Sequence, residues 1–202
     1  MKRGPNHRRG VREMRRYLAL ILPVFLLGAC ESSGLSSQGS AAAEFWFETL
    51  PQMVATSDVV FLGTVVEVRD GTTEGPPGEE IEHLDAVVRV DEALFGLIDE
   101  SATLTVQTLK FVEPEREWRE VGATVLAFLK QSPDREDEGR YYLMNDQSLY
   151  LVVDGDILGA VEGDRLSDEI ASMSIEEVRE AIATTTPSIE AGVITPQPPV
   201  GS

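Results

Sequence analysis

The chain contains a single cysteine, Cys30, among its 202 residues. One thiol cannot form an internal disulfide, so any fold of this chain must be stabilised by its hydrophobic core without covalent cross-links. Hydrophobic residues make up 42% of the sequence, which is enough for such a core. The length suits one ordinary domain with additional tails.

Cys30 stands at the end of a short apolar run with a basic flank. Residues 1–16 hold seven of the 17 Lys and Arg residues, and the apolar run from Tyr17 to Ala29 has 13 residues. A helix that spans a bilayer needs about 20 apolar residues, so this run is too short to be a comfortable membrane anchor. Its length and basic flank are typical of a secretory signal peptide, which predicts export.

The residues directly before Cys30 make this prediction more specific. Leu27, Gly28 and Ala29 followed by the cysteine resemble the lipobox of bacterial lipoprotein precursors. The resemblance implies cleavage after Ala29, attachment of diacylglycerol to the Cys30 sulfur, and a lipid-anchored protein on the extracytoplasmic side of the cell membrane. Two or more acyl chains, such as palmitate, give durable anchoring where one chain does not. The alternative is an ordinary signal peptide, in which the cysteine follows Ala29 by chance.

Composition divides the chain into four segments. We predict a lipoprotein signal peptide at 1–29, the lipidated cysteine with a Ser-, Gly- and Ala-rich tether at 30–43, one domain at 44–185, and an unstructured Pro-rich tail at 186–202. From Cys30 onwards the chain has ten basic and 34 acidic side chains, a net charge of −24. Such a charge repels phosphate groups, which excludes nucleic acid as a partner and makes the lipid the only predicted link to the membrane.

The domain is dominated by strand signals. In the stretch 57–69, Val60, Leu62, Val66 and Val68 share one face at a period of two, and Gly63 predicts a bend or bulge. Strands are predicted at 57–69, 85–94, 101–109, 122–130 and 140–144, with a loop at 70–80 and a hairpin at 148–161 that turns at Asp154-Gly155.

Two helices are predicted to flank these strands. A short helical turn covers residues 51–56. A longer helix begins after Ser174, which forms a capping box with Glu177, and its apolar stripe includes Val178 and Ile182. We expect this helix to cover one end of the β structure.

The number of short strands and the Gly-marked bends predict a mainly β fold. We expect a small antiparallel OB-like barrel with a short N-terminal helix and a C-terminal helix. The order "ATSDVVFLGTVVEV", "VVRVDEALFG", "TLTVQT", "VLAFL" and "VVDGD" is similar to the netrin-like OB barrels of secreted bacterial proteins, which share their fold with tissue inhibitors of metalloproteinases. The resemblance covers about residues 55–160 and implies binding across one face of the barrel. A β-sandwich or an open α+β sheet is the alternative.

The inhibitors in that family use a free N-terminal cysteine, itself disulfide-bonded, to chelate the zinc of their target. This chain departs from that pattern because Cys30 is predicted to be lipidated, lies well before the barrel and has no partner thiol. The sequence therefore does not favour inhibition by that mechanism.

The mature domain offers few residues for catalysis or metal binding. It contains one histidine, His83, which is predicted to lie at the surface, and no nucleophile elbow. A calcium loop starting at Asp154 fails because its fifth and twelfth positions are Leu158 and Arg165. Glu67 interrupts an apolar strand, but a strand end that emerges into solvent explains it. We predict no catalytic residue, no metal site and no cofactor.

Aromatic residues offer a candidate contact patch. Phe45, Trp46 and Phe47 form a triplet directly after the tether. Exposed, they would mark a binding surface. The favoured alternative is that they cover one end of the barrel.

Two functional hypotheses are compatible with these features of the sequence. The first is a membrane-anchored extracytoplasmic lipoprotein whose non-catalytic domain binds a protein or an envelope ligand. The second is a carboxylate-dependent hydrolase of an envelope polymer, which needs two converging acids, one of them with a raised pKa. The scarcity of catalytic side chains favours the first.

Overall fold

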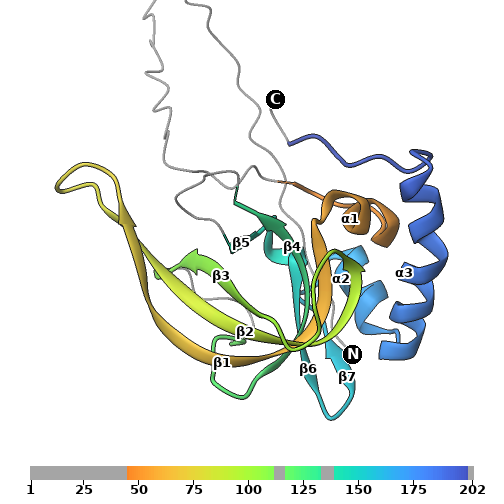
Figure 1. Ribbon diagram of the computed structural model, residues 1–202, viewed down its shortest axis with the longest axis horizontal. Coiled ribbons are helices and arrows are strands. Elements are labelled where there is room, and N and C mark those ends of the chain that lie inside the picture. Colours follow the sequence, from red (N-terminus) through yellow and green to blue (C-terminus); the bar gives the residue numbers. More distant parts are fainter. Residues whose placement is uncertain (1–44, 112–116, 133–138, 200–202) are drawn as a thin grey trace, which may run out of the picture. The chain divides into compact units, whose positions relative to one another are not determined.

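The computed structural model describes residues 45–111, 117–132 and 139–199. The predicted signal peptide, the lipobox, Cys30 and the tether lie outside the described residues. Within the described ranges the chain forms a seven-stranded sheet and three α-helices (Figure 1), which confirms the prediction of a mainly β fold.

The elements follow the predicted order closely. The strands are β1 (Val59–Glu74), β2 (Ile81–Gly96), β3 (Thr103–Leu109), β4 (Thr124–Gln131), β5 (Arg140–Leu143), β6 (Leu149–Val153) and β7 (Asp156–Leu158). The helices are α1 (Leu50–Thr56), α2 (Arg165–Ala171) and α3 (Ile175–Glu190), and a 3-10 turn, η2 (Asp146–Ser148), precedes β6. Helix α2 was not predicted, because its seven residues are too few to show a clear helical period.

Five of the strands pair in a partial ring. The order across the sheet is β1-β2-β3-β5-β4-β6-β7, and β1 also pairs with β4. The β3–β5 pair is parallel, with Thr105 opposite Arg140 and Gln107 opposite Tyr142. The prediction of an antiparallel arrangement is therefore wrong at this pair. Because β4 lies between β3 and β5 in the chain, the connection is long enough for β5 to return in the direction of β3.

The sheet buries apolar side chains on both faces. Phe61, Val106 and Trp118 belong to a cluster on the inner face of the ring. Val60 and Phe128 belong to a second cluster on the opposite face, which the three helices cover (Figure 1). The double burial explains why the first half of β1 and all of β4 are rich in apolar residues.

Bulges shift the register between β1 and β2. The register against β2 shifts between Leu62 and Gly63, which confirms the predicted bulge, and again between Val65 and Glu67. The extra residue at Val66 reverses the alternation of the strand. Val68 consequently packs with the cluster on the inner face of the ring, and not on the face of Val60 as predicted.

Strands β1 and β2 form a longer hairpin than predicted. Thr73 pairs with Glu82 and Glu74 with Ile81, so the loop is confined to residues 75–80. Mutual pairing of the two strands extends them through residues 70–74, although Asp70 and Gly71 have low strand propensity. The hairpin extends away from the three helices, at the left of Figure 1.

Helix α3 has the predicted start and a later end. Ser174 and Glu177 form the predicted capping box, and Val178 and Ile182 are buried. The helix continues through Pro187 to Glu190, past residue 185, the predicted end of the domain. Beyond it, the backbone N–H of Gln197 donates to Thr56 Oγ1 at 2.9 Å, so this part of the predicted tail contacts α1.

An ion pair joins α3 to β2. Arg179 donates from Nε to Glu92 Oε1 at 2.6 Å and from Nη2 to Glu92 Oε2 at 2.9 Å. The hydrogen bond with Arg179 is the main reason that the pKa of Glu92 lies below its ordinary value of 4.5. A carboxyl group with a lowered pKa stabilises the fold above its ordinary pKa, and this contribution is lost as the pH falls through the lowered value.

We therefore expect Arg179→Met to lower the free energy of unfolding at neutral pH, and the difference from wild type to shrink as the pH falls below 4.5. Urea unfolding of the wild type and of Arg179→Met, from neutral pH to below pH 4.5, measures this difference in the free energy of unfolding. Glu92→Gln is the matched control, because it removes the titrating partner and should show the same pH dependence. If the difference in free energy of unfolding between Arg179→Met and wild type stays constant below pH 4.5, the ion pair with Glu92 is not its cause.

Candidate functional site

The predicted aromatic triplet separates into two buried residues and one exposed residue. Phe45 and Phe47 are 3% and 1% exposed and belong to the core cluster under the helices, where their rings stack. Trp46 between them is 48% exposed. The two phenylalanines thus occupy the core cluster under the helices, and Trp46 alone of the three remains at the surface.

Side-chain amides hold this segment in place. The backbone N–H of Phe47 donates to Gln147 Oε1 at 3.0 Å, and Gln147 Nε2 donates to the Phe47 carbonyl at 3.3 Å. Asn145 Nδ2 donates to the Phe45 carbonyl at 2.6 Å, and Gln147 Nε2 also donates to Asp164 Oδ1 at 2.9 Å. Gln147 is fully buried. It joins the start of the domain to the N-terminus of α2.

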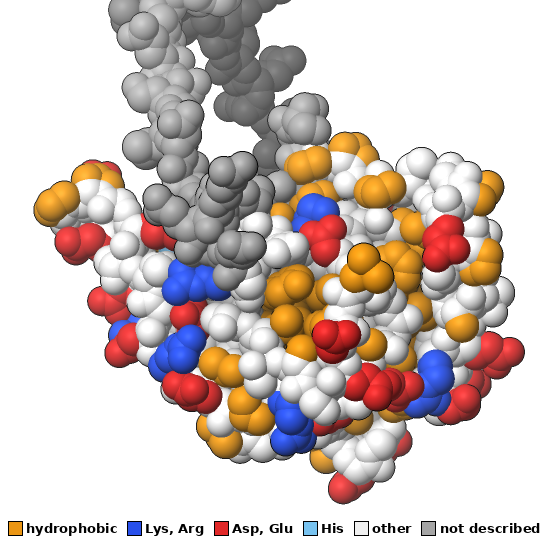
Figure 2. Space-filling view, in the orientation of Figure 1, with side chains coloured by type: hydrophobic (Ala, Val, Ile, Leu, Met, Phe, Trp, Pro, Cys, Tyr) orange, Lys and Arg blue, Asp and Glu red, His pale blue; other side chains and the backbone are white. Residues whose placement is uncertain are grey.

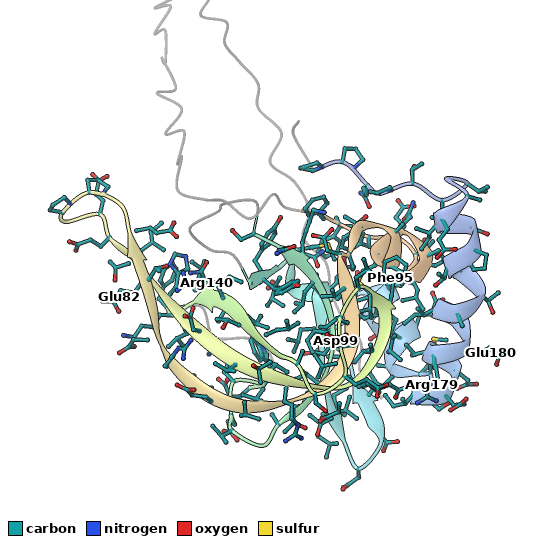
Figure 3. The ribbon with its side chains drawn as sticks, in the orientation of Figure 1. Glu82, Phe95, Asp99, Arg140, Arg179 and Glu180 are labelled. Carbon is teal, nitrogen blue, oxygen red and sulfur yellow. The ribbon has the colours of Figure 1, made fainter. Side chains whose placement is uncertain are left out.

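A second group of polar side chains lies at the base of the β1–β2 hairpin, and we call it the hairpin-base cluster. Its members come from β1, β2, β3 and β5: Arg69, Thr72, His83, Asp85, Gln107 and Arg140. Ala86 and Val106 face the inner cluster of the ring, so Asp85 and its register partner Gln107 lie on the outer face. In Figure 3, Arg140 lies near β3, beside the hairpin that carries Glu82.

Asp85 is the buried centre of this cluster. Its side chain is 3% exposed, and its Oδ2 lies 3.5 Å from Arg140 Nη2 and 3.9 Å from Arg69 Nε. Its Oδ1 is buried without a hydrogen-bond partner. A Cβ at Gly71 would lie 2.8 Å from this oxygen, so glycine is required there for the carboxylate to fit against β1.

His83 also lies in this cluster, and the prediction that it is a surface residue is wrong. The side chain is 7% exposed, and its Nδ1 lies 3.2 Å from the carbonyl oxygen of Thr72. Thr72 Oγ1 in turn accepts a hydrogen bond from Gln107 Nε2 at 2.8 Å. The irregularity between Asp70 and Thr73 on β1 brings Thr72 into position for these contacts. A buried polar group needs such partners, which explains how a histidine is accommodated there.

The outer part of the hairpin carries mainly acidic side chains. Residues 67–82 contain six carboxyl groups and one arginine. Lys110 contacts two of them, Asp70 at 2.9 Å and Glu82 at 3.0 Å, and the hydrogen bond with Asp70 is the main reason that its pKa is raised. Glu67 is exposed, as predicted, and contacts Arg69 at 3.4 Å, but it does not lie at a strand end, because β1 continues to Glu74. Figure 2 shows red and blue side chains interleaved on this side of the molecule.

The hairpin-base cluster combines one carboxylate with guanidinium and amide donors. Asp85 and His83 are buried, so the solvent-facing donors of the cluster are the guanidinium groups of Arg69, which is 50% exposed, and Arg140, which is 26% exposed. Among residues 45–111, 117–132 and 139–199, no three or more His, Cys, Asp and Glu side chains are grouped to hold a metal ion. The rejected calcium loop is a tight hairpin turn, with positive φ at Asp154 and Gly155 as a type I′ turn requires.

Sequence reasoning missed both polar groups. His83 and Asp85 alternate with Leu84 and Ala86, a pattern that also fits a strand with one face in solvent. The burial of Gln147 depends on segments 100 residues apart, which no local pattern records.

No family model and no curated protein matches this chain. In the part of the chain that the structure describes, no helix is long and apolar enough to cross a bilayer.

Proposed function

We propose that the chain is an extracytoplasmic lipoprotein, anchored in the cell membrane through Cys30, whose β domain is a non-catalytic binding module. Its ligand is a protein or another component of the cell envelope. The anchoring part rests on the resemblance of Leu27-Gly28-Ala29-Cys30 to a lipobox. The binding part rests on the hairpin-base cluster, above all on Arg69 and Arg140, whose partly exposed guanidinium groups are held beside the buried carboxylate of Asp85.

The partial ring supports an OB-like barrel as the finer description of the fold. Five strands pair in a circuit from β1 through β2, β3, β5 and β4 back to β1, as in a partly open five-stranded Greek-key barrel. OB barrels bind ligands on the face of their second and third strands and on the loop between the first two. The hairpin-base cluster lies on the outer face of β2 and β3, beside the β1–β2 hairpin.

Among the described residues, the carboxyl groups with displaced pKa values give no candidate for the general acid of a hydrolase. A glycan hydrolase needs a general acid with a raised pKa. Three described carboxyl groups, Glu92, Glu117 and Glu177, have displaced pKa values, and all three are lowered by hydrogen bonds. None of the three belongs to the hairpin-base cluster, so the binding proposal does not depend on their pKa values.

Anchoring is tested by the Cys30→Ser variant. We expect the wild-type chain, expressed in a bacterium that processes lipoproteins, to incorporate labelled palmitate and to fractionate with the membrane. Cys30→Ser should incorporate no label, because serine lacks the sulfur that accepts the lipid. Mass spectrometry of the mature wild-type protein should find a modified cysteine at its N-terminus. An unmodified cysteine or an intact leader would disprove the anchoring proposal.

Binding is tested on the mature chain with serine at position 30, immobilised and exposed to solubilised envelope components. Arg69→Gln alters the hairpin-base cluster, and Arg89→Gln, which lies outside that cluster, is the matched control, since both arginines lie on the β1–β2 hairpin and are 50% and 48% exposed. We expect Arg69→Gln to lose a retained component that wild type and Arg89→Gln keep. Equal retention by all three proteins would place the binding surface elsewhere, and retention of nothing would contradict a binding module.

A further inference from the structure

Trp46 is a large apolar side chain that the fold holds at the surface. It is 48% exposed, while Phe45 and Phe47 on either side are buried. The alternation of an extended segment turns Trp46 away from the core that its neighbours enter. The exposure of Trp46 therefore follows from the direction of its side chain.

The backbone on both sides of Trp46 is fixed by hydrogen bonds. The carbonyl of Phe45 accepts from Asn145 Nδ2, and both backbone polar groups of Phe47 bond to Gln147. The N–H of Phe45 also donates to the carbonyl of Met144 at 3.5 Å. The fold thus presents the indole on an ordered backbone, which lowers the conformational entropy that a contact of this side chain must overcome.

Trp46 is also close in the chain to the proposed lipid anchor. It follows Cys30 by sixteen positions, so the two can be at most about 55 Å apart along a fully extended chain. A lipid at Cys30 would confine this part of the domain to a thin layer above the membrane. Such confinement raises the effective concentration of Trp46 at the headgroups, so that a weak contact becomes well populated.

We propose that Trp46 inserts its indole ring into the headgroup region of the membrane that holds the lipid of Cys30, and thereby orients the domain on the membrane. The inference rests on the proposed anchoring. Indole combines an apolar body with one N–H donor, and tryptophan is enriched where apolar and aqueous phases meet. The net charge of −24 opposes approach to anionic lipids, so the contact should be strongest on zwitterionic membranes.

The composition of the chain makes a fluorescence test direct. The sequence has two tryptophans, and the second, Trp118, is 4% exposed inside the ring. Mature protein that starts at Cys30 is coupled through its only thiol to a maleimide lipid in phosphatidylcholine vesicles. Two sets of vesicles are compared, one with ordinary phosphatidylcholine and one whose acyl chains carry bromine near the headgroup. The bromine quenches the fluorescence of a tryptophan that contacts it. The difference in emission between wild type and Trp46→Phe isolates Trp46 without any change in the core.

We expect bromolipid to remove most of the Trp46 emission in the coupled wild-type protein and to shift the rest to shorter wavelength. Trp46→Phe, which retains Trp118, should lose little emission. Wild-type protein with its thiol capped by N-ethylmaleimide should also lose little, because the confinement is absent. Unchanged Trp46 emission in protein that co-floats with the vesicles would overturn the proposal.

Chemical coupling separates this inference from the anchoring proposal. If cells do not lipidate Cys30, palmitate labelling fails while the vesicle experiment still reports on Trp46. If lipidation occurs and quenching is absent, the anchoring proposal stands and the membrane contact is disproved. Equal quenching in capped protein would disprove the dependence on the tether.

Discussion

Replacing Gln147 by leucine is expected to lower the free energy of unfolding by about 4 kcal/mol, because each buried backbone group left without a partner costs about 1–3 kcal/mol. The side chain of Gln147 is fully buried and bonds both polar backbone groups of Phe47. Leucine has similar volume but neither donor nor acceptor. The N–H and carbonyl of Phe47 would then remain buried without partners, and Asp164 Oδ1 would lose one of its donors.

Urea unfolding measures this change, with Gln131→Leu as the control. Gln131 is exposed at the end of β4, so the same substitution there should change the free energy of unfolding by less than about 0.5 kcal/mol. Amide hydrogen exchange at Phe47 gives a second readout, since loss of the Gln147 acceptor should release this N–H to exchange before global unfolding. A loss below about 1 kcal/mol, with Phe47 still protected, would show that the segment is held in another way.

The periodic parts of the fold could be predicted from the sequence. The apolar alternation of β3 and the run of apolar residues in β4 identified these strands, because period and length are local properties. The same holds for the capping box at Ser174 and for the turn at Asp154-Gly155. Each of these signals acts within a few residues, so no knowledge of the tertiary structure was needed to read it.

Features that depend on partners distant in the chain were not predictable. The bulge at Val66 became visible only through the shifted register between β1 and β2, and it moved Val68 to the other face of the sheet. The parallel pair of β3 and β5 requires knowledge of how β4 is placed. Hydrophobic pattern fixes which residues prefer burial, but it does not state which bulge or crossover satisfies that preference.

In the candidate site, too, local features could be predicted and those that depend on distant partners could not. Aromatic character drew attention to residues 45–47, but only the structure separates exposed Trp46 from its buried neighbours. Asp85 and Gln147 were missed because charged and amide side chains are mostly exposed in proteins, and their burial is decided by specific partners. Buried polar residues of this kind carry no local periodic signal.

The burial of Asp85 leads to a second prediction, on Arg140. Removing one partner of a buried ion pair costs about 3–5 kcal/mol, because it leaves a buried charge uncompensated. Arg140 is 26% exposed and lies 3.5 Å from Asp85 Oδ2, so solvent screens part of the interaction. We therefore expect Arg140→Met to lower the free energy of unfolding by about 2 kcal/mol. Arg69, at 3.9 Å and half exposed, compensates only part of the charge.

A second substitution decides whether the buried charge causes this loss. Asp85→Asn in the Arg140→Met background replaces the carboxylate by a neutral amide of the same shape, so the double variant should recover about half of the stability that Arg140→Met loses. The Arg89–Asp91 pair is the matched control: its side chains are 48% and 37% exposed, and the corresponding variants should differ from wild type by less than about 1 kcal/mol. If Asp85→Asn lowers the stability of Arg140→Met further, Asp85 contributes through hydrogen bonds rather than through its charge, and the electrostatic account of the hairpin-base cluster is wrong.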